Sequence, residues 1–374
     1  MKQHNFNLLL TVLFCLFIGG MFLGSILLPD RTFSQLENRN LAAAPKLSWE
    51  TVTTGTFMED AEDYVNDQII GRDFWVALKA WSERVSGKQE NNGVYFAKED
   101  TLISRVDTPS QSDLEENAGY VNALVNNVDV PVYFGIIPSA AEIWSYRLPE
   151  GAPTADEKAI IDRLYNEVQT HVIDLYSVLN AHKDEELYYR TDHHWTSLGA
   201  YYGYTALMNA MGLEAVPLDE SQKVTVSDEF YGTLFSSSGV RWLPPDHIDR
   251  YISDEGVTVT AYPNGAPEPG SLYVDSYLEV KDKYSSFLGG NKPLCVIETE
   301  HTDAPKVLVI RDSYADSLAP FLTQNFSEIH LFDPRYNLTS VKNYVTQNEI
   351  DSVVVLYSIS NFTAKDNQMF VLGR

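Results

Sequence analysis

The chain has 374 residues, of which 44% are hydrophobic and 12% aromatic, so it can bury the core of one large domain or of two smaller ones. Acidic residues number 52 against 27 basic residues, which gives a formal net charge of −25. A surface that acidic repels phosphate backbones, so no nucleic-acid partner is expected. The two cysteines, Cys15 and Cys295, lie far apart in the chain, which excludes a disulfide framework.

The first segment is a run without charged residues from Phe6 to Leu28. Its roughly 23 residues suffice to cross about 30 Å of hydrocarbon as a helix, and a usual signal-peptide core has only about 7–15 residues. Lys2 precedes the run, which favours an inside N-terminus and an outside remainder. For residues 1–29 we therefore predict an uncleaved signal anchor, which makes the chain a single-pass protein of the cell membrane with an extracytoplasmic domain. A cleaved signal peptide is the alternative.

Residues 30–90 are predicted to form a connector and N-terminal helices. The stretch 28–50 is polar, contains Ala and Pro, and has no sustained periodicity, so we expect it to be extended. From Phe57 to Val85 apolar residues recur mostly three or four positions apart, which predicts a helix. Gly71 is expected to divide that helix into two.

Residues 91–374 alternate between predicted strands and helices after a hairpin at 93–106. We expect helices at 112–126, 155–170, 196–211 and 315–324, and strands at 130–138, 171–179, 306–310, 328–333 and 351–358. This alternation predicts an α/β fold, with helices on both faces of a sheet. The stretch of about 217–278 is rich in Gly, Pro, Ser and Asp, and we interpret it as an inserted lid of loops and strands.

An acid and two histidines stand together at Asp192-His193-His194, directly before Trp195. Residues two apart in an extended chain point the same way, so Asp192 and His194 are expected to share a face while His193 points elsewhere. An acid beside an imidazole fixes its tautomer and stabilises its charged form, as in a nucleophilic triad. His193 is interpreted first as a packing residue. Trp195 is expected beneath the site, with sugar stacking as its second interpretation.

Ser313 is the candidate nucleophile, because Cys295 lies in a predicted strand with nothing nearby to lower the pKa of its thiol. An apolar strand runs into Arg311-Asp312-Ser313, and a predicted helix follows. Ser313 would thus lie at the carboxyl end of a strand, where ligands bind in open α/β sheets. N–H groups at the helix start could stabilise an oxyanion. The alternative is that Ser313 only caps the helix.

The segment "YYRTDHHWTSLGAYYGY", Tyr188 to Tyr204, resembles the signature of the bacterial DHHW protein family, which is similar to the SGNH-hydrolase-like alginate O-acetyltransferase proteins AlgJ and AlgX. Five further stretches also resemble the family: "FSQLENRNLAAAPKLS", "DQIIGRDFWVALK", "GKQENNGVYF", "DKYSSFLGGN" and "VLVIRDSYADSLAPFL". The resemblance implies an SGNH-hydrolase-like domain over 91–374, with Asp192, His194 and Ser313 as the catalytic residues. Asp312 departs from the Gly-Thr-Ser-like turn of the alginate acetylation proteins.

The reaction implied by the resemblance is acyl transfer through an acyl-serine. His194 takes the proton of Ser313 as the serine attacks an ester carbonyl, and Asp192 orients His194. The acetyl group then passes to a sugar hydroxyl or to water. The Ser313 N–H is one expected oxyanion donor, and the further oxyanion and substrate residues are expected to be Gly290, Asn291, Asn361, Arg190 and Trp195.

We therefore predict a membrane-anchored serine O-acetyltransferase or acetylesterase that acts on a cell-surface polysaccharide without a cofactor or a metal. If it is a transferase, the resemblance implies a membrane-bound O-acyltransferase as the partner that supplies acetyl groups. Two other hypotheses stay open. One is a metal-dependent hydrolase with Asp192, His193 and His194 as ligands. The other is a non-catalytic glycan-binding or scaffold protein, which the departure at Asp312 keeps open.

Overall fold

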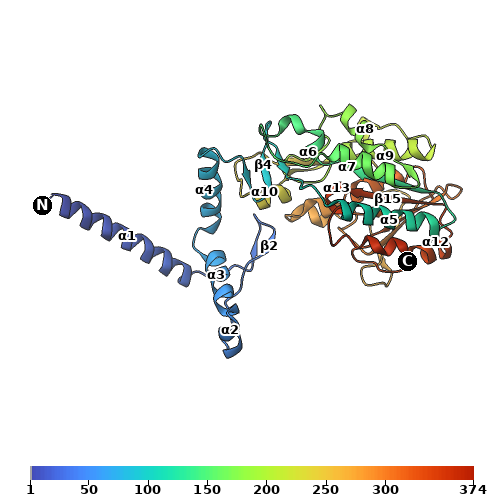
Figure 1. Cartoon of the computed structure of the whole chain (residues 1–374). Coiled ribbons are helices and arrows are strands. Elements are labelled where there is room, and N and C mark those ends of the chain that lie inside the picture. Colours follow the sequence, from blue (N-terminus) through green and yellow to red (C-terminus); the bar gives the residue numbers. More distant parts are fainter. Residues whose placement is uncertain (1) are drawn as a thin grey trace. The chain divides into compact units, whose positions relative to one another are not determined.

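The computed structural model describes residues 2–374, which divide into two compact units. The smaller unit contains the chain up to Lys88 together with Ser236–Trp242, and the larger unit contains Gln89–Phe235 and Leu243–Arg374. Each unit is described by itself (Figure 1).

The smaller unit begins with helix α1 (Lys2–Leu27), which is long and apolar enough over Gln3–Leu27 to cross a membrane. The predicted division at Gly71 is confirmed, because this glycine adopts φ 69° between two helices. The remaining elements of the unit before Lys88 are β1 (Phe33–Ser34), β2 (Arg39–Asn40), α2 (Trp49–Thr54), α3 (Thr56–Gln68) and α4 (Arg72–Val85).

The connector is tied to the helices by charge pairs. Arg72 at the start of α4 donates to both carboxylate oxygens of Glu37, at 2.7 and 2.8 Å. Arg39 donates to Asp67 of α3 at 2.8 and 2.5 Å. Burial opposes ionisation of Glu37, but the guanidinium groups of Arg72 and Arg39 outweigh it and lower the pKa of that carboxyl. The connector is therefore an ordered part of this unit.

The larger unit is built on an eight-stranded sheet of strand order β11-β10-β12-β14-β13-β15-β6-β7. Its middle strands β14, β13, β15 and β6 are parallel, as predicted, and β12 and β10 extend the sheet in antiparallel fashion. The parallel strands β13 and β15 are almost fully buried and rich in Val, Ile and Leu, as a parallel sheet covered on both faces requires. The strand bounds are β6 (Val132–Ile137), β7 (His171–Val172), β10 (Thr258–Ala261), β11 (Glu268–Pro269), β12 (Leu294–Glu298), β13 (Lys306–Arg311), β14 (Glu328–Phe332) and β15 (Ser352–Ser358).

Helices cover both faces of this sheet, which confirms the predicted α/β class (Figure 1). Helix α9 contacts both α8 and α11, and α5 contacts both α7 and α12. The chain leaves β13 for β14 through α11 and returns to β15 through α12; right-handed crossovers in opposite directions place these two helices on opposite faces. The helix bounds are α5 (Gln111–Asn127), α6 (Ala140–Ile143), α7 (Glu157–Glu167), α8 (Leu175–Ala181), α9 (Ser197–Met211), α10 (Thr233–Ser238), α11 (Ala315–Leu322), α12 (Val341–Gln347) and α13 (Ile359–Phe362).

The smaller elements complete the larger unit. Strands β4 and β5 form the predicted hairpin, and β3 pairs with β4 beside it. The bounds of these strands, of the pair β8 and β9, and of the short 3-10 helices are β3 (Glu90–Asn91), β4 (Val94–Phe96), β5 (Leu102–Ser104), β8 (Val224–Phe230), β9 (Asp246–Arg250), η1 (Ser145–Arg147), η2 (Glu220–Gln222), η3 (Asp275–Glu279), η4 (Lys283–Ser286) and η5 (Met369–Gly373).

The predicted strand at 171–179 is wrong beyond its first two residues. Only His171 and Val172 pair with β6, and α8 follows at once. Asp174 caps this helix by accepting a hydrogen bond from the Ser177 N–H at 3.0 Å. Leu175 and Leu179 are two of the apolar residues that suggested a strand. They lie four positions apart and are both buried on one face of this helix.

The inserted stretch 217–278 contains strands, as predicted, but they do not form one separate lid. Strands β8 and β9 pair with each other. Strands β10 and β11 instead join the main sheet, because β10 pairs with β12 from Thr258↔Glu298 to Ala261↔Cys295. The insertion therefore widens the sheet.

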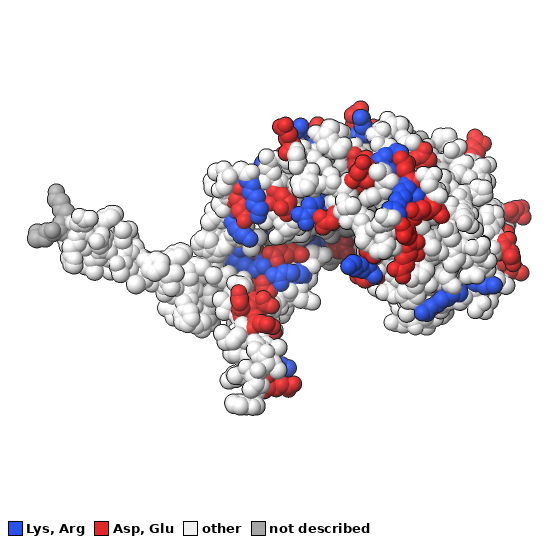
Figure 2. All heavy atoms as spheres, viewed as in Figure 1, with Lys and Arg blue, Asp and Glu red and all other residues white. Residues whose placement is uncertain are grey.

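Charge on the visible face is mixed. Figure 2 shows Asp and Glu side chains scattered over it, with Lys and Arg among them.

One buried carboxyl outside the motifs is Glu157, the first residue of α7. Its two oxygens accept from the backbone N–H and the hydroxyl of Ser139, at 2.8 and 2.6 Å. The side chain is fully buried, and burial raises the pKa of Glu157 to about 7 in spite of these hydrogen bonds.

Glu157→Gln should stabilise the protein at pH 8 and not at pH 5. A carboxyl with a raised pKa contributes its full stability below its unfolded pKa of about 4.5 and loses it as pH rises through about 7. Ionisation therefore costs the folded state on the order of 3 kcal/mol at pH 8, and a neutral amide avoids this cost. The measurement is the melting temperature of both chains across this pH range, with exposed Glu214→Gln as the control. If the melting temperature of Glu157→Gln differed from that of the parent by the same amount at pH 5 and pH 8, the raised pKa of Glu157 would be contradicted.

Candidate active site

The acid and the imidazole of the Asp-His-His-Trp segment meet in a turn rather than in an extended strand. Tyr188 and Trp195 form an antiparallel bridge, so the chain between them doubles back. The backbone N–H of His194 donates to Asp192 Oδ1 at 3.0 Å, and His194 Nδ1 lies 2.6 Å from the same oxygen. An aspartate that bonds the backbone two residues on is a common turn-forming device. The expectation that Asp192 and His194 act on each other is thus met by a turn.

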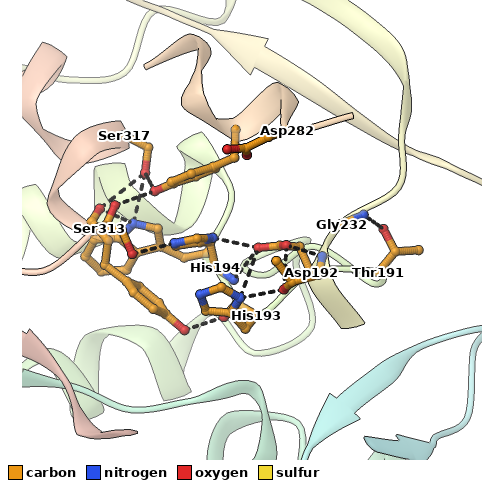
Figure 3. A network of polar contacts seen from close by, with 12 residues as sticks. Thr191, Asp192, His193, His194, Gly232, Asp282, Ser313 and Ser317 are labelled. Atoms are coloured by element: carbon orange, nitrogen blue, oxygen red, sulfur yellow. Dashed lines mark hydrogen bonds and ion pairs between the residues drawn. The ribbon is translucent and has the colours of Figure 1, made fainter. Parts of the chain in front are cut away.

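The predicted separation of His193 from His194 is wrong, because the same turn brings the two rings together. Their centroids lie 3.9 Å apart. His193 Nδ1 is 2.7 Å from Thr233 Oγ1, and burial and the neighbouring His194 lower the pKa of His193. His193 is therefore a neighbour of the Asp192–His194 pair and stands beside it in Figure 3.

The other oxygen of Asp192 is held by the inserted stretch. The backbone N–H and the hydroxyl of Thr233 donate to Asp192 Oδ2 at 2.7 and 2.9 Å. Burial disfavours the ionised carboxylate, but the two imidazoles, the hydrogen bond from His194 and the Thr233 N–H outweigh it and lower the pKa of Asp192 far below its ordinary value. Asp192 is thus a buried, ionised acid with a fixed orientation.

Ser313 completes a chain of three side chains. It follows β13 and precedes α11, and its Oγ lies 2.8 Å from His194 Nε2 (Figure 3). The hydroxyl does not cap the helix, which rules out the capping alternative; the residue at the cap position is Tyr314, without a side-chain cap. Ser313 is partly exposed, whereas both of its neighbours, Asp312 and Tyr314, are buried. The structure therefore joins Asp192, His194 and Ser313 from segments 119 residues apart.

Asp312 does not interfere with the serine, because its carboxylate points to the end of β15. Its Oδ2 accepts from the backbone N–H and the hydroxyl of Ser358 at 2.9 and 2.6 Å, and from Asn361 Nδ2 at 2.8 Å. Its Oδ1 accepts from the Tyr314 N–H at 3.0 Å. The acid beside the nucleophile thus anchors the serine turn to the neighbouring strand.

An aromatic residue that the motif analysis did not single out covers His194. The Tyr284 ring stacks on the imidazole, with centroids 3.8 Å apart and planes 10° apart. Its hydroxyl donates to the Ser313 carbonyl at 3.0 Å, so one side chain touches both catalytic candidates. Tyr284 lies in "DKYSSFLGGN", one of the stretches that resemble the family, but nothing in that stretch indicates which residue reaches the site.

The residues predicted as oxyanion or substrate contacts fall into three groups. Gly290 and Asn291 are committed to structure, since the Gly290 N–H donates to Phe287 and Asn291 Oδ1 accepts from Arg311 at 2.8 Å. Arg190 bonds Asp246 at 3.2 Å, and Trp195 is fully buried. Asn361 donates to the carboxylate of Asp312, the residue before the serine.

The backbone N–H of Ser313 is the other group suited to an oxyanion. It donates no hydrogen bond to any part of the chain that the structure describes, residues 2–374. An N–H that makes no hydrogen bond within the protein and lies beside a reactive hydroxyl can bind the oxygen that becomes negative when the serine attacks a carbonyl.

Metal binding is a second possibility that the residues allow. Ligand atoms of Asp192, His193 and His194 lie within 4.8 Å of one another. Both ring nitrogens of His194 are already engaged, one by Asp192 and one by Ser313. A metal would have to displace one of these partners. Cys295 is no competing nucleophile, because burial raises the pKa of its thiol to about 12.

The comparisons with known proteins agree on the family. The DHHW protein family matches residues 106–332. A DHHW family protein from Eubacterium siraeum has a crystal structure that matches this one with a TM-score of 0.66. The two sequences are 26% identical, and the match covers 75% of this chain and 95% of that one. Bacillus cereus PatB1 with a sulfonyl adduct is 20% identical, with a TM-score of 0.62, over 74% and 98% of the two chains, which shows a shared fold. No curated protein matches the chain.

A third structure is more distant. The O-acetyltransferase domain of Pseudomonas putida AlgJ is 14% identical, with a TM-score of 0.46, over 73% of this chain and 93% of that one. The expected membership of the DHHW family and the expected likeness of the fold are therefore confirmed by the family match and by the first two structures.

Gly232→Ala should disable the site through Asp192. A Cβ at Gly232 would lie 2.2 Å from the Asp192 Cβ and 2.3 Å from its Oδ2, so the carboxylate must move. We expect Ser313 to react with a sulfonyl fluoride about a hundredfold more slowly, as measured by mass spectrometry of the labelled chain. The control is Gly119→Ala in α5, where a Cβ meets nothing within 4 Å. Equal labelling rates in the two variants would refute this role of Asp192.

Proposed function

The chain belongs to the DHHW family, and we propose that it is a serine O-acetyltransferase or acetylesterase that acts on a cell-surface polysaccharide. One observation carries the proposal: His194 lies 2.6 Å from Asp192 and 2.8 Å from Ser313, so a single imidazole links an acid to a hydroxyl. That order of side chains is the arrangement that activates a serine nucleophile. The fold shared with PatB1 supports the proposal, and the sulfonyl adduct in that structure suggests a reagent for testing it.

The first half of the reaction transfers an acyl group to the protein. Ser313 Oγ attacks the ester carbonyl and forms a C–O bond, while its proton passes to His194 Nε2. The carbonyl oxygen becomes negative and is stabilised by the Ser313 N–H and by the second amide hydrogen of Asn361. The tetrahedral intermediate then breaks its bond to the leaving alcohol, which receives the proton from His194. Asp192 keeps the imidazole oriented throughout and stabilises its charged form.

The second half releases the acyl group. A sugar hydroxyl gives its proton to His194 as its oxygen attacks the acyl-serine, and Ser313 recovers that proton when it leaves. Water in place of the sugar hydroxyl gives hydrolysis by the same steps. Helix α1 would hold this chemistry at the cell membrane as a single-pass anchor, with the larger unit outside the cytoplasm. A membrane-bound O-acyltransferase would be the partner that delivers acetyl groups.

Ser313→Ala should abolish covalent labelling and strongly reduce acetyl turnover. The parent chain, purified at full length in detergent, is expected to gain one acetyl group on Ser313 from an activated acetyl ester, as seen by peptide mass spectrometry. Both Ser313→Ala and His194→Ala should lower turnover by about a thousandfold or more, because the residues of a triad act as a unit. Melting temperatures near that of the parent show that the variants are folded.

Two outcomes would favour the other hypotheses. Turnover that is lost to a chelator and kept in Ser313→Ala would indicate metal-dependent hydrolysis by the Asp192 cluster. A parent chain that neither a sulfonyl fluoride nor an acetyl ester ever labels would indicate a scaffold or glycan-binding protein without catalysis.

Tyr284→Leu should slow the reaction, and Tyr284→Phe should restore most of it. The ring stacked on His194 stabilises the imidazolium that forms during attack, and leucine lacks such a face. Phenylalanine keeps the face and loses only the hydroxyl bonds to Ser313 and Ser317. We expect a roughly tenfold loss in labelling rate for Tyr284→Leu, since a desolvated cation–π contact contributes about 1–2 kcal/mol. Equal losses in both variants would show that the hydroxyl and not the ring matters.

A further inference from the structure

A cleft opens at one edge of the main sheet. It has a volume of about 520 Å³. The segment after β10 forms one wall with Tyr262 and Asn264, and helix α12 forms another with Asn343, Tyr344 and Gln347. Tyr336, which is 57% exposed, lies between β14 and α12 and contributes a third aromatic ring. The volume of the cleft is in the range of small-molecule binding sites.

The lining of this cleft is uncharged. No Asp, Glu, Lys or Arg is among the lining residues, all of which belong to the described chain 2–374, although 21% of the whole sequence is charged. The lining combines three tyrosine rings with amide side chains. Within residues 2–374, the side chains of Asn264, Asn343 and Gln347 make no hydrogen bond with the protein, so their donors and acceptors are available.

Helix α12 places two of these amide side chains next to each other. Asn343 and Gln347 are four positions apart, so they lie on one face of the helix. Tyr344 is fixed beside them, because its hydroxyl bonds His330 Nδ1 at 2.8 Å. An amide offers a donor and an acceptor side by side, which matches a pair of neighbouring hydroxyl groups, and a tyrosine ring offers an apolar face with a polar tip.

The cleft lies at the same sheet edge as Ser313. Strand β14 ends at Phe332 opposite Ile310 of β13, and β12 begins at Leu294 opposite Phe332. The cleft residues adjoin the ends of β10, β12 and β14, and Ser313 follows β13, the next strand. At about 4.8 Å per strand, the ends of β14, β12 and β10 that border the cleft lie roughly 5, 10 and 15 Å from the end of β13 along the sheet. A few linked sugar rings can span such a distance.

From these observations we infer that the cleft is a subsite for uncharged sugar residues of the polysaccharide, bound beside the sugar that reacts at Ser313. The inference rests on the proposed function for its choice of polymer, and it adds that the flanking sugars are neutral. An anionic glycan would find no cation in the lining and would meet a chain of net charge −25. Stacking on tyrosine and hydrogen bonds to amides both serve uncharged rings.

Binding should be measured with the full-length Ser313→Ala chain, which cannot turn over an ester, in a detergent without a sugar head group. The probes are cellohexaose and chitohexaose as neutral glycans and a galacturonic acid hexamer as the anionic one, each titrated by calorimetry. At least one neutral hexamer should bind, and the galacturonate hexamer should not. The added double substitution Asn343→Ala and Gln347→Ala should weaken neutral binding by about tenfold, and so should Tyr336→Ala.

Thr346→Ala is the matched control, because Thr346 lies on the same helix, is exposed and does not line the cleft. It should bind the neutral hexamer as the Ser313→Ala chain does. The inference is overturned if no neutral hexamer binds, if the galacturonate hexamer binds instead, or if the cleft variants bind as Thr346→Ala does. Sulfonyl labelling of Ser313 in the parent chain is a separate measurement, so failure of the proposed function is distinguishable from failure of the cleft.

Discussion

The indole of Trp195 is the contact on which the site depends, because it joins two segments that lie 119 residues apart in the chain. Its N–H donates to the Tyr314 carbonyl at 2.9 Å and to Ser317 Oγ at 3.0 Å, and the ring is fully buried. Gly203 of α9 leaves room for it, since a Cβ there would lie 2.6 Å from the ring. The loop before α9 is thus packed on the start of α11, and this packing sets the distance from His194 to Ser313.

Two buried carboxylates hold the remaining geometry. A carboxylate removed from water is costly unless hydrogen-bond donors replace the water. Asp192 takes its donors from His194 and from Thr233 in the inserted stretch, and Asp312 takes its donors from β15 and α13. Each acid therefore fastens a loop of the site to a segment that is distant in sequence. This arrangement explains how an acidic residue can stand beside the serine without occupying the space above its hydroxyl.

Local patterns predicted much of the fold, because they depend on neighbours in sequence. The buried strands around Ser313, the helix opened by Thr196 and the division at Gly71 each follow from apolar runs, capping residues or glycine, and all are present. The predicted strand at 171–179 is wrong because a short apolar run fits a strand and a capped helix equally well until Asp174 is seen to bond Ser177. The separation of His193 from His194 is wrong because it assumed an extended chain.

The sequence by itself determined the class of fold and the apolar N-terminal helix, and it identified Asp192, His194 and Ser313 as the catalytic candidates. Each of these follows from a local pattern or from a motif. Only the tertiary structure decided that these three meet, that Thr233 and Tyr284 complete their surroundings, and that Arg190 and Asn291 are committed to protein partners. The physical reason is that hydrogen bonds and stacking between distant segments depend on how strands and helices pack, and no spacing along the chain records that packing.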